Sequence, residues 1–132
     1  MTQQVVLITG ALTGIGRATA VAFAGKGASV VVSGRHDDKG QALVAELKAL
    51  GAQAEFVRAD VTKEDEVRNL VDKAVARFGR LDVAVNNAGY EGETGPVQDV
   101  TVENFKAIHD TNVLGVFLSM KYELREIGRA HV

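Results

Sequence analysis

A glycine-rich segment near the start of the chain constrains the fold more than any other feature. The apolar run Val5–Ile8 predicts a strand, and it leads into Thr9–Gly16, whose glycines are spaced Gly-x-x-x-Gly-x-Gly before a helix-forming run from Arg17. Glycine adopts backbone angles closed to other residues, and without a Cβ it lets the chain approach a ligand closely. The helix that follows points unpaired N–H groups and the positive end of its dipole at the turn, which favours phosphate. A strand, glycine turn and helix in this order predict a dinucleotide-binding site.

The next part of the chain alternates strands and helices with short connections. We expect strands at Val5–Ile8, Ala28–Ser33, Ala54–Arg58 and Leu81–Val85, with intervening helices that end near Gly27, Gly51 and Gly79. Successive apolar residues in the strands indicate burial on both faces, and the alternation predicts right-handed βαβ units around a parallel sheet. We expect Asp37 or Asp38 to cap the second helix, and Thr62–Asp65 to form a capping box for the third.

The last third of the chain departs from this alternation. Gly89–Pro96 predicts a surface loop, and a long helix is expected from Thr101 or Val102 to Gly128. One stripe of this helix is apolar: Phe105, Ile108, Val116, Met120, Leu124 and Ile127. Asn112 lies on the same stripe, where an unpaired polar group costs about 1–3 kcal/mol. Asn112 is therefore either a core residue bonded to nearby backbone or a functional residue.

Composition excludes several classes of function. The 132 residues form one domain at most, and 46% hydrophobic and 24% charged residues are ordinary for a globular protein. A net charge of −2 gives no reason to expect nucleic acid or an anionic membrane as partner. There is no cysteine, no apolar run approaches the ~20 residues that span a bilayer, and the three histidines lack metal-ligand spacing. We expect a cytoplasmic protein with no metal site and no membrane segment.

Further motifs follow the glycine turn in a recognisable order: Asp60-Val61 after the third strand, Asn86–Gly89 after the fourth, and Asn112 in the long helix. Together with Thr9-Gly10-x-x-x-Gly14-x-Gly16 they resemble the short-chain dehydrogenase/reductase family, from about Gln4 to about Glu126. The resemblance implies an α/β fold, a Rossmann-type doubly wound parallel sheet with strand order 3-2-1-4. A sugar-nucleotide epimerase from the extended branch of the family fits less well, because its turn usually reads Gly-x-x-Gly-x-x-Gly.

The resemblance also implies a cofactor and its ligands. The residues that match cofactor-binding positions of the family are Gly10, Leu12, Thr13, Gly14, Ile15, Gly16, Arg35, Asp60, Val61, Asn87, Ala88 and Gly89. Gly34 stands where NAD-using relatives carry a carboxylate that repels a 2′-phosphate, and the Arg35 guanidinium could bind that phosphate with two parallel hydrogen bonds. We therefore expect NADP, with NAD as the alternative. Arg35 as a plain solvated arginine remains the other interpretation.

The sequence contains one residue that matches a catalytic residue of the family. Asn112 matches the asparagine of the family's Asn-Ser-Tyr-Lys set, but neither Tyr90 nor Tyr122 is followed by a lysine four residues later. Hydride transfer to a carbonyl needs a proton donor close to the oxygen, which that tyrosine supplies in the family. We expect residues 1–132 to be a truncated NAD(P)-binding domain that lacks the catalytic half and is inactive alone.

The resemblance further implies what the complete protein would do. It would transfer hydride between NADP(H) and a small-molecule alcohol or carbonyl, and we expect it to form a homo-oligomer. The alternative is a non-catalytic nucleotide-binding or interaction module, in which the short chain is the real product.

Overall fold

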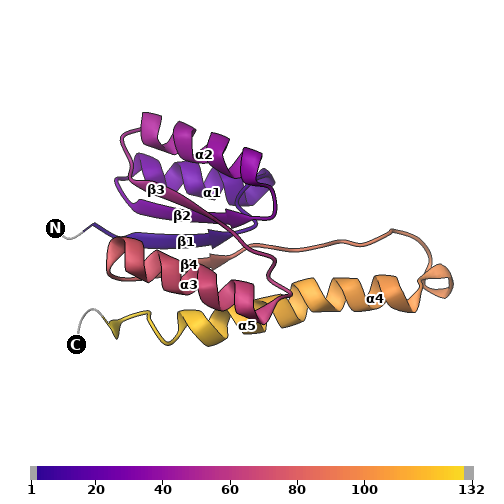
Figure 1. The fold of residues 1–132 in the computed structure, drawn as a ribbon. Helices are drawn as coiled ribbons and strands as arrows, with labels where there is room; N and C mark the ends of the chain where they lie inside the picture. Colours follow the sequence, from indigo (N-terminus) through magenta and orange to yellow (C-terminus); the bar gives the residue numbers. More distant parts are fainter. Residues whose placement is uncertain (1–2, 130–132) are drawn as a thin grey trace.

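The centre of the structure, a computed structural model that describes residues 3–129, is a parallel sheet (Figure 1). Its strands are β1 (Val5–Thr9), β2 (Ser29–Gly34), β3 (Ala54–Arg58) and β4 (Val83–Asn86), in the spatial order β3-β2-β1-β4. In the register, Leu7 of β1 lies opposite Val31 of β2 and Ala84 of β4. The predicted fold class and strand order are confirmed, although β2 begins one residue and β4 two residues later than expected.

The middle strand β1 divides the core because all of its residues are buried and successive side chains point to opposite faces. Helices α1 (Gly14–Gly25) and α2 (Asp37–Ala49) cover one face, and α3 (Glu64–Phe78) and α5 (Gly115–Glu123) cover the other (Figure 1). Val6 and Ile8 pack in the first cluster with α1 and α2, whereas Val5 and Leu7 pack in the second with α3 and α5. The apolar runs of the sequence therefore form a sheet that is covered on both sides.

Two helices begin at places other than those predicted. Helix α1 begins at Gly14 rather than Arg17, so the glycine turn runs directly into its first turn. Helix α2 has His36 as its N-cap, and Asp37 and Asp38 lie in its first turn without capping it by a side-chain hydrogen bond. Carboxylates in a first turn still face the positive end of the helix dipole, which accounts for their position.

Helix α3 has the predicted apolar face but not the predicted cap. Its buried residues are Val67, Leu70, Val71 and Ala74, and the helix ends before Gly79. The N-cap is Lys63, with no side-chain hydrogen bond. The capping box is absent because the Thr62 hydroxyl donates to Asp60 Oδ1 at 2.7 Å instead.

The long helix predicted near the end of the chain consists of three segments. After the 3-10 turn η1 (Val97–Asp99) come α4 (Val102–His109), the π-helix η2 (Asp110–Leu114) and α5. Thr101 caps α4, since its hydroxyl accepts the Asn104 N–H at 3.1 Å, and α4 projects beyond the carboxyl ends of the strands (Figure 1). Helix α5 ends at Glu123 rather than Gly128. Across residues 3–129, no helix has the length and apolar character needed to cross a membrane.

Much of the predicted apolar stripe is not the face that packs on the core, although Ile127 at its end packs against the second cluster. Phe105, Met120 and Leu124 are 62%, 46% and 65% exposed, whereas Leu118 and Tyr122 are buried. The packed face also contains the small residues Gly115 and Ser119. A Cβ on Gly115 would lie 2.7 Å from Val61 Cγ2, so the close approach of α5 depends on this glycine. Because small and polar residues form part of this face, the spacing of large apolar residues in the sequence does not predict it.

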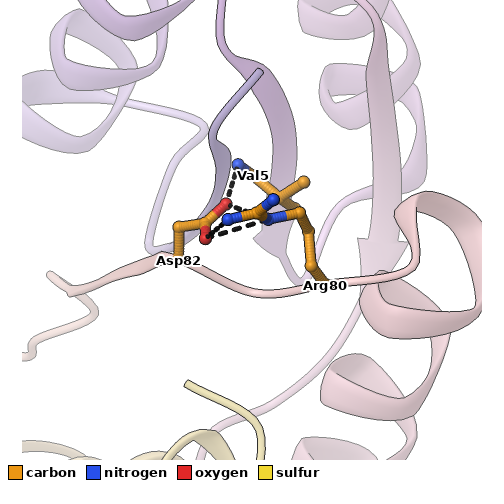
Figure 2. A network of polar contacts seen from close by, with 3 residues as sticks. All are labelled: Val5, Arg80 and Asp82. Atoms are coloured by element: carbon orange, nitrogen blue, oxygen red, sulfur yellow. Dashed lines mark hydrogen bonds and ion pairs between the residues drawn. The ribbon is translucent and has the colours of Figure 1, made fainter. Parts of the chain in front are cut away.

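At the amino ends of the strands, a polar network joins β1 to the segment before β4 (Figure 2). Asp82 Oδ2 accepts the Val5 N–H at 2.8 Å, and the Asp82 N–H donates to the Val5 carbonyl at 3.0 Å. Arg80 donates from Nε to both carboxylate oxygens (3.0 and 2.9 Å) and from Nη2 to Oδ1 (2.6 Å). These charge-assisted hydrogen bonds fix where the two strands begin to pair.

Glu123 is a carboxyl group buried between α5 and β4, with only 2% of the residue exposed. Its Oε1 accepts Asn86 Nδ2 at 2.9 Å, while Glu123 Oε2 and Asn86 Oδ1 have no partner among the described residues. Burial raises the pKa of Glu123, and the hydrogen bond from Asn86 only partly opposes this. A neutral carboxyl carries an O–H that can donate a hydrogen bond. Protonation of Glu123 therefore supplies a donor where Glu123 Oε2 and Asn86 Oδ1 otherwise have none.

We predict that Glu123→Gln reduces the pH dependence of stability. The pKa of Glu123 is higher in the folded state than its ordinary value of 4.5. The neutral carboxyl therefore stabilises the folded chain fully below pH 4.5, and this contribution is lost as the pH rises through the folded-state pKa. Glutamine keeps the shape and the donor without titrating, so the unfolding temperature of this variant should change less between about pH 5 and about pH 8 than that of the native chain. Glu103→Gln, at an exposed position on α4, is the control. A pH dependence in E123Q equal to the native one would contradict a neutral Glu123.

Candidate functional site

A cavity of about 630 Å³ opens where the strands end, the edge of a parallel sheet at which α/β proteins bind ligands. Most of the predicted cofactor-binding residues line it: Gly10, Leu12, Thr13, Arg35, Asp60, Val61, Ala88 and Gly89. Gly14, Ile15, Gly16 and Asn87 do not belong to its lining. A larger cavity, of about 1000 Å³, lies at the opposite edge, where Lys26 and Arg80 line it near the starts of the strands. The smaller cavity is the candidate site because the sequence motifs converge there.

The glycine turn has a backbone that other residues could not follow. Gly10 and Gly14 have φ values of +61° and +55°, in the left-handed region. A Cβ on Gly16 would lie 2.1 Å from the Gly10 carbonyl oxygen and 2.5 Å from Asn87 Nδ2. The turn therefore folds closely over the start of α1, whose first N–H groups have no partner within the helix. This arrangement suits an anion at the helix end.

The segment after β4 is tied to this turn. Asn87 Nδ2 donates to the Gly10 carbonyl at 2.9 Å, and Thr9 Oγ1 accepts the N–H groups of Asn87 and Ala88, each at 3.2 Å. These bonds place Ala88 and Gly89 along the cavity wall. Asn87 therefore acts in this structure by holding the turn.

Asp60 is an ionised carboxylate at the cavity. Burial raises the pKa of Asp60, but hydrogen bonds from the backbone and hydroxyl of Thr62, with the positive charges of Arg35 and Lys63, outweigh it and lower the pKa below its ordinary value. Both hydrogen bonds go to Oδ1, at 2.9 and 2.7 Å. An ionised carboxylate accepts hydrogen bonds only, so Asp60 can bind a ligand through an N–H or O–H donor.

Basic side chains line the cavity near the end of β2. The cations Arg35 and Lys39 belong to the lining, as does the imidazole of His36, and within residues 3–129 neither Arg35 nor Lys39 takes part in an ion pair. Sequence reasoning missed Lys39, for which the only signal was its position in α2 four residues after Arg35. Two unpaired cations at one end of a cavity favour a ligand with a negative group there.

Asn112 lies in η2 and is exposed, so the prediction that it belongs to an apolar face is wrong. Its side chain bonds the loop after β4: Oδ1 accepts the Tyr90 N–H at 2.8 Å and Nδ2 donates to the Tyr90 carbonyl at 2.9 Å. Asn112 does not line the cavity, although its neighbours Asp110 and Thr111 do. Sequence reasoning missed both of these neighbours, because their only signal is their position before Asn112. Among residues 3–129, no cluster of three metal-ligating side chains exists.

Comparison with known proteins agrees with this geometry. The family model described as short chain dehydrogenase matches residues 4–131. The chain belongs to the short-chain dehydrogenase family. It is 37% identical over 123 residues to a 3beta-hydroxysteroid dehydrogenase of Mediterraneibacter gnavus, with 93% of this chain and 45% of the relative covered. It is 39% identical over 127 residues to an L-fucose dehydrogenase of Oryctolagus cuniculus, with 96% and 43% covered.

A solved structure of NAD+-bound xylitol dehydrogenase superimposes with a TM-score of 0.90 at 35% identity, covering 93% of this chain and 47% of that one. The chain thus spans less than half the length of each of these three relatives. What the comparisons establish for these residues is an oxidoreductase family whose members include dehydrogenases, and its nucleotide-binding Rossmann fold.

The packing of the turn predicts opposite effects for two glycines of α1. Gly16→Ala should destabilise the chain by about 1–3 kcal/mol, because its Cβ meets backbone that cannot move aside without breaking the turn. Gly25→Ala, the matched control, meets no atom within 4 Å and should be neutral or stabilising by up to about 1 kcal/mol. Equilibrium unfolding in urea measures both, and an unchanged stability of Gly16→Ala would contradict the turn geometry.

Proposed function

We propose that this chain is the cofactor-binding part of a dehydrogenase, that it binds a nicotinamide dinucleotide, and that it prefers NADP(H) to NAD(H). The observation that carries the proposal is that two features meet at one cavity: a glycine turn at a helix start, and the cations Arg35 and Lys39, which form no ion pair within residues 3–129. The turn suits the pyrophosphate and the cations suit a further phosphate.

The residues present fit such a cofactor. Asp60 would accept a hydrogen bond from the adenine amino group, and Val61, which lines the cavity beside it, would pack against the ring. Ala88 and Gly89 carry small or absent side chains, so the backbone there can approach a ribose. Ser33 also lines the cavity, and its buried hydroxyl has no hydrogen-bond partner among the described residues. The cavity lining thus has groups suited to the adenine and to a ribose of the dinucleotide.

The preference for NADP(H) rests on the end of β2. Gly34 offers no carboxylate to repel a 2′-phosphate, and the Arg35 guanidinium can form two parallel charge-assisted hydrogen bonds to one. The xylitol dehydrogenase neighbour is named as NAD+-bound, so the shared fold gives no support for NADP(H), and the proposed preference rests on Gly34 and Arg35 alone. NAD remains the alternative that the binding measurement below distinguishes.

The chemistry of the whole protein is part of the same proposal. Bound NADP(H) would donate or accept the hydride, and the substrate would be a small-molecule alcohol or carbonyl. We assign Asn112 the relay role that the family resemblance implies. Tyr122 is no proton donor for this step, since its hydroxyl donates to Glu64 Oε2 at 2.7 Å and that bond raises its pKa. Residues 1–132 then serve as the cofactor-binding portion of the domain.

We also propose that the complete protein is a cytoplasmic homo-oligomer. The support for the oligomer is the set of large apolar residues exposed on α4, η2 and α5 and at the C-cap of α5, namely Val102, Phe105, Val113, Phe117, Met120 and Leu124. Exposed apolar surface of this kind is typical of interaction sites.

Arg35→Ala should remove the preference for the phosphorylated cofactor. Losing a bidentate charge-assisted contact should weaken NADPH binding roughly tenfold to hundredfold and leave NADH binding nearly unchanged. Calorimetric titration of the protein, at the full length its gene encodes, measures both affinities. Arg68→Ala, at an exposed arginine of α3 outside the cavity, is the control. Tighter binding of NADH than NADPH by the native protein would overturn the preference.

A polypeptide of residues 1–132 alone should have no dehydrogenase activity. It contains no tyrosine followed by a lysine four residues later, and a positioned general acid typically contributes about 10²–10⁴-fold. NADPH oxidation is followed by absorbance with a panel of small carbonyl compounds, beside the protein at the length its gene encodes. Turnover by the 132-residue polypeptide that is abolished by Gly14→Trp would show that the active site has been misplaced. Turnover by neither form would favour the alternative of a non-catalytic nucleotide-binding or interaction module.

A further inference from the structure

The side chain of Leu12 lies where a side chain at position 34, the last residue of β2, would lie. A Cβ on Gly34 would lie 2.6 Å from both Cγ and Cδ1 of Leu12. Gly34 does not have a positive φ, so its backbone conformation would accept other residues. The obstacle to a side chain at position 34 is therefore the side chain of Leu12 and not the backbone conformation.

The backbone on both sides of this contact is held in place. The Ala11 N–H donates to the Ser33 carbonyl at 3.0 Å, and the Ala59 N–H donates to the Gly34 carbonyl at 3.0 Å. The turn and the strand end therefore cannot separate without losing hydrogen bonds. Only the Leu12 side chain could move, and it packs against the core cluster formed with α1 and α2.

The contact lies at the point where the cavity would meet a ribose. Leu12 and Gly34 both line the cavity, beside Arg35 and Lys39. In dinucleotide folds, an acidic residue about twenty positions after the glycine motif accepts hydrogen bonds from the ribose 2′-hydroxyl, whereas an arginine nearby accommodates a 2′-phosphate. Gly34 follows Gly14 by twenty positions (34 − 14 = 20). The hydrocarbon of Leu12 thus occupies the place from which an acid would project.

We propose that Leu12 is a specificity-determining residue: by filling the space at position 34 it excludes a carboxylate there and reserves the ribose 2′ position for a phosphate held by the neighbouring cations. The proposal rests on the proposed function, since it concerns the same cofactor. It adds that Gly34 and Leu12 act as a pair. Changing position 34 alone should therefore weaken binding of the phosphorylated cofactor without improving binding of the unphosphorylated one.

The test uses the protein at the full length its gene encodes, with 2′,5′-ADP and 5′-AMP as probes of the adenosine half. Calorimetric affinities are measured for the native protein, Gly34→Asp, Leu12→Ala and the double variant. Gly34→Asp alone should lose affinity for 2′,5′-ADP without gaining affinity for 5′-AMP. In the double variant the affinity ratio should shift toward 5′-AMP by about tenfold more than the two single changes predict together.

Val21→Ala combined with Gly34→Asp is the matched control, because Val21 packs against the same core cluster but does not line the cavity. The control pair should behave additively. If Gly34→Asp alone reverses the preference as fully as the double variant does, the role of Leu12 is overturned while the proposed function stands. If the native protein binds neither probe and no dinucleotide, the proposed function fails and the specificity role fails with it.

A second measurement tests the steric contact itself and does not depend on a folded Gly34→Asp variant. Gly34→Ala should lower the unfolding temperature when Leu12 is present and should have little effect when it is combined with Leu12→Ala. An equal loss in both backgrounds would show that Leu12 does not occupy the space at position 34.

Discussion

The hydrogen bond from Asn87 Nδ2 to the Gly10 carbonyl joins the two chain segments on which the site depends. It connects the turn after β1 to the segment after β4, strands that pair in parallel although they lie far apart in the sequence. Gly16 permits the contact, since a side chain there would enter the space of both partners. The start of α1 and the cavity wall at Ala88 are positioned by the same contact, which ties the shape of the site to the pairing of β1 with β4.

The ionisable groups on the two sides of the sheet lie in different electrostatic surroundings. The cations Arg35 and Lys39 line the cavity at the end of β2, and the ionised Asp60, whose pKa the charge of Arg35 helps to lower, lines it too. Groups suited to a phosphate and to a hydrogen-bond donor therefore lie in the same cavity. On the face of the sheet covered by α5, the pKa of a carboxyl group is raised and not lowered. Burial raises the pKa of Glu123, and a neutral carboxyl suits its contact with Asn86.

The sequence was sufficient to predict features that follow from periodicity and glycine geometry. The strand order, the glycine turn and the apolar face of α3 all follow from local pattern together with the resemblance to the family. What could not be predicted depends on contacts between distant segments. The packed face of α5 relies on Gly115 fitting against Val61, Lys39 lines the cavity from α2, and a side chain at position 34 would meet Leu12. None of these leaves a signal in spacing alone.

The most direct test of a dinucleotide site at the carboxyl ends of the strands is a crystal structure of the protein grown with NADP+. The pyrophosphate should lie against the N–H groups at the start of α1, with the 2′-phosphate next to Arg35 and the adenine beside Asp60. NADP+ bound instead in the cavity near Lys26 and Arg80, at the opposite edge of the sheet, would contradict the site. A cavity that stays empty at saturating NADP+ would contradict it as well.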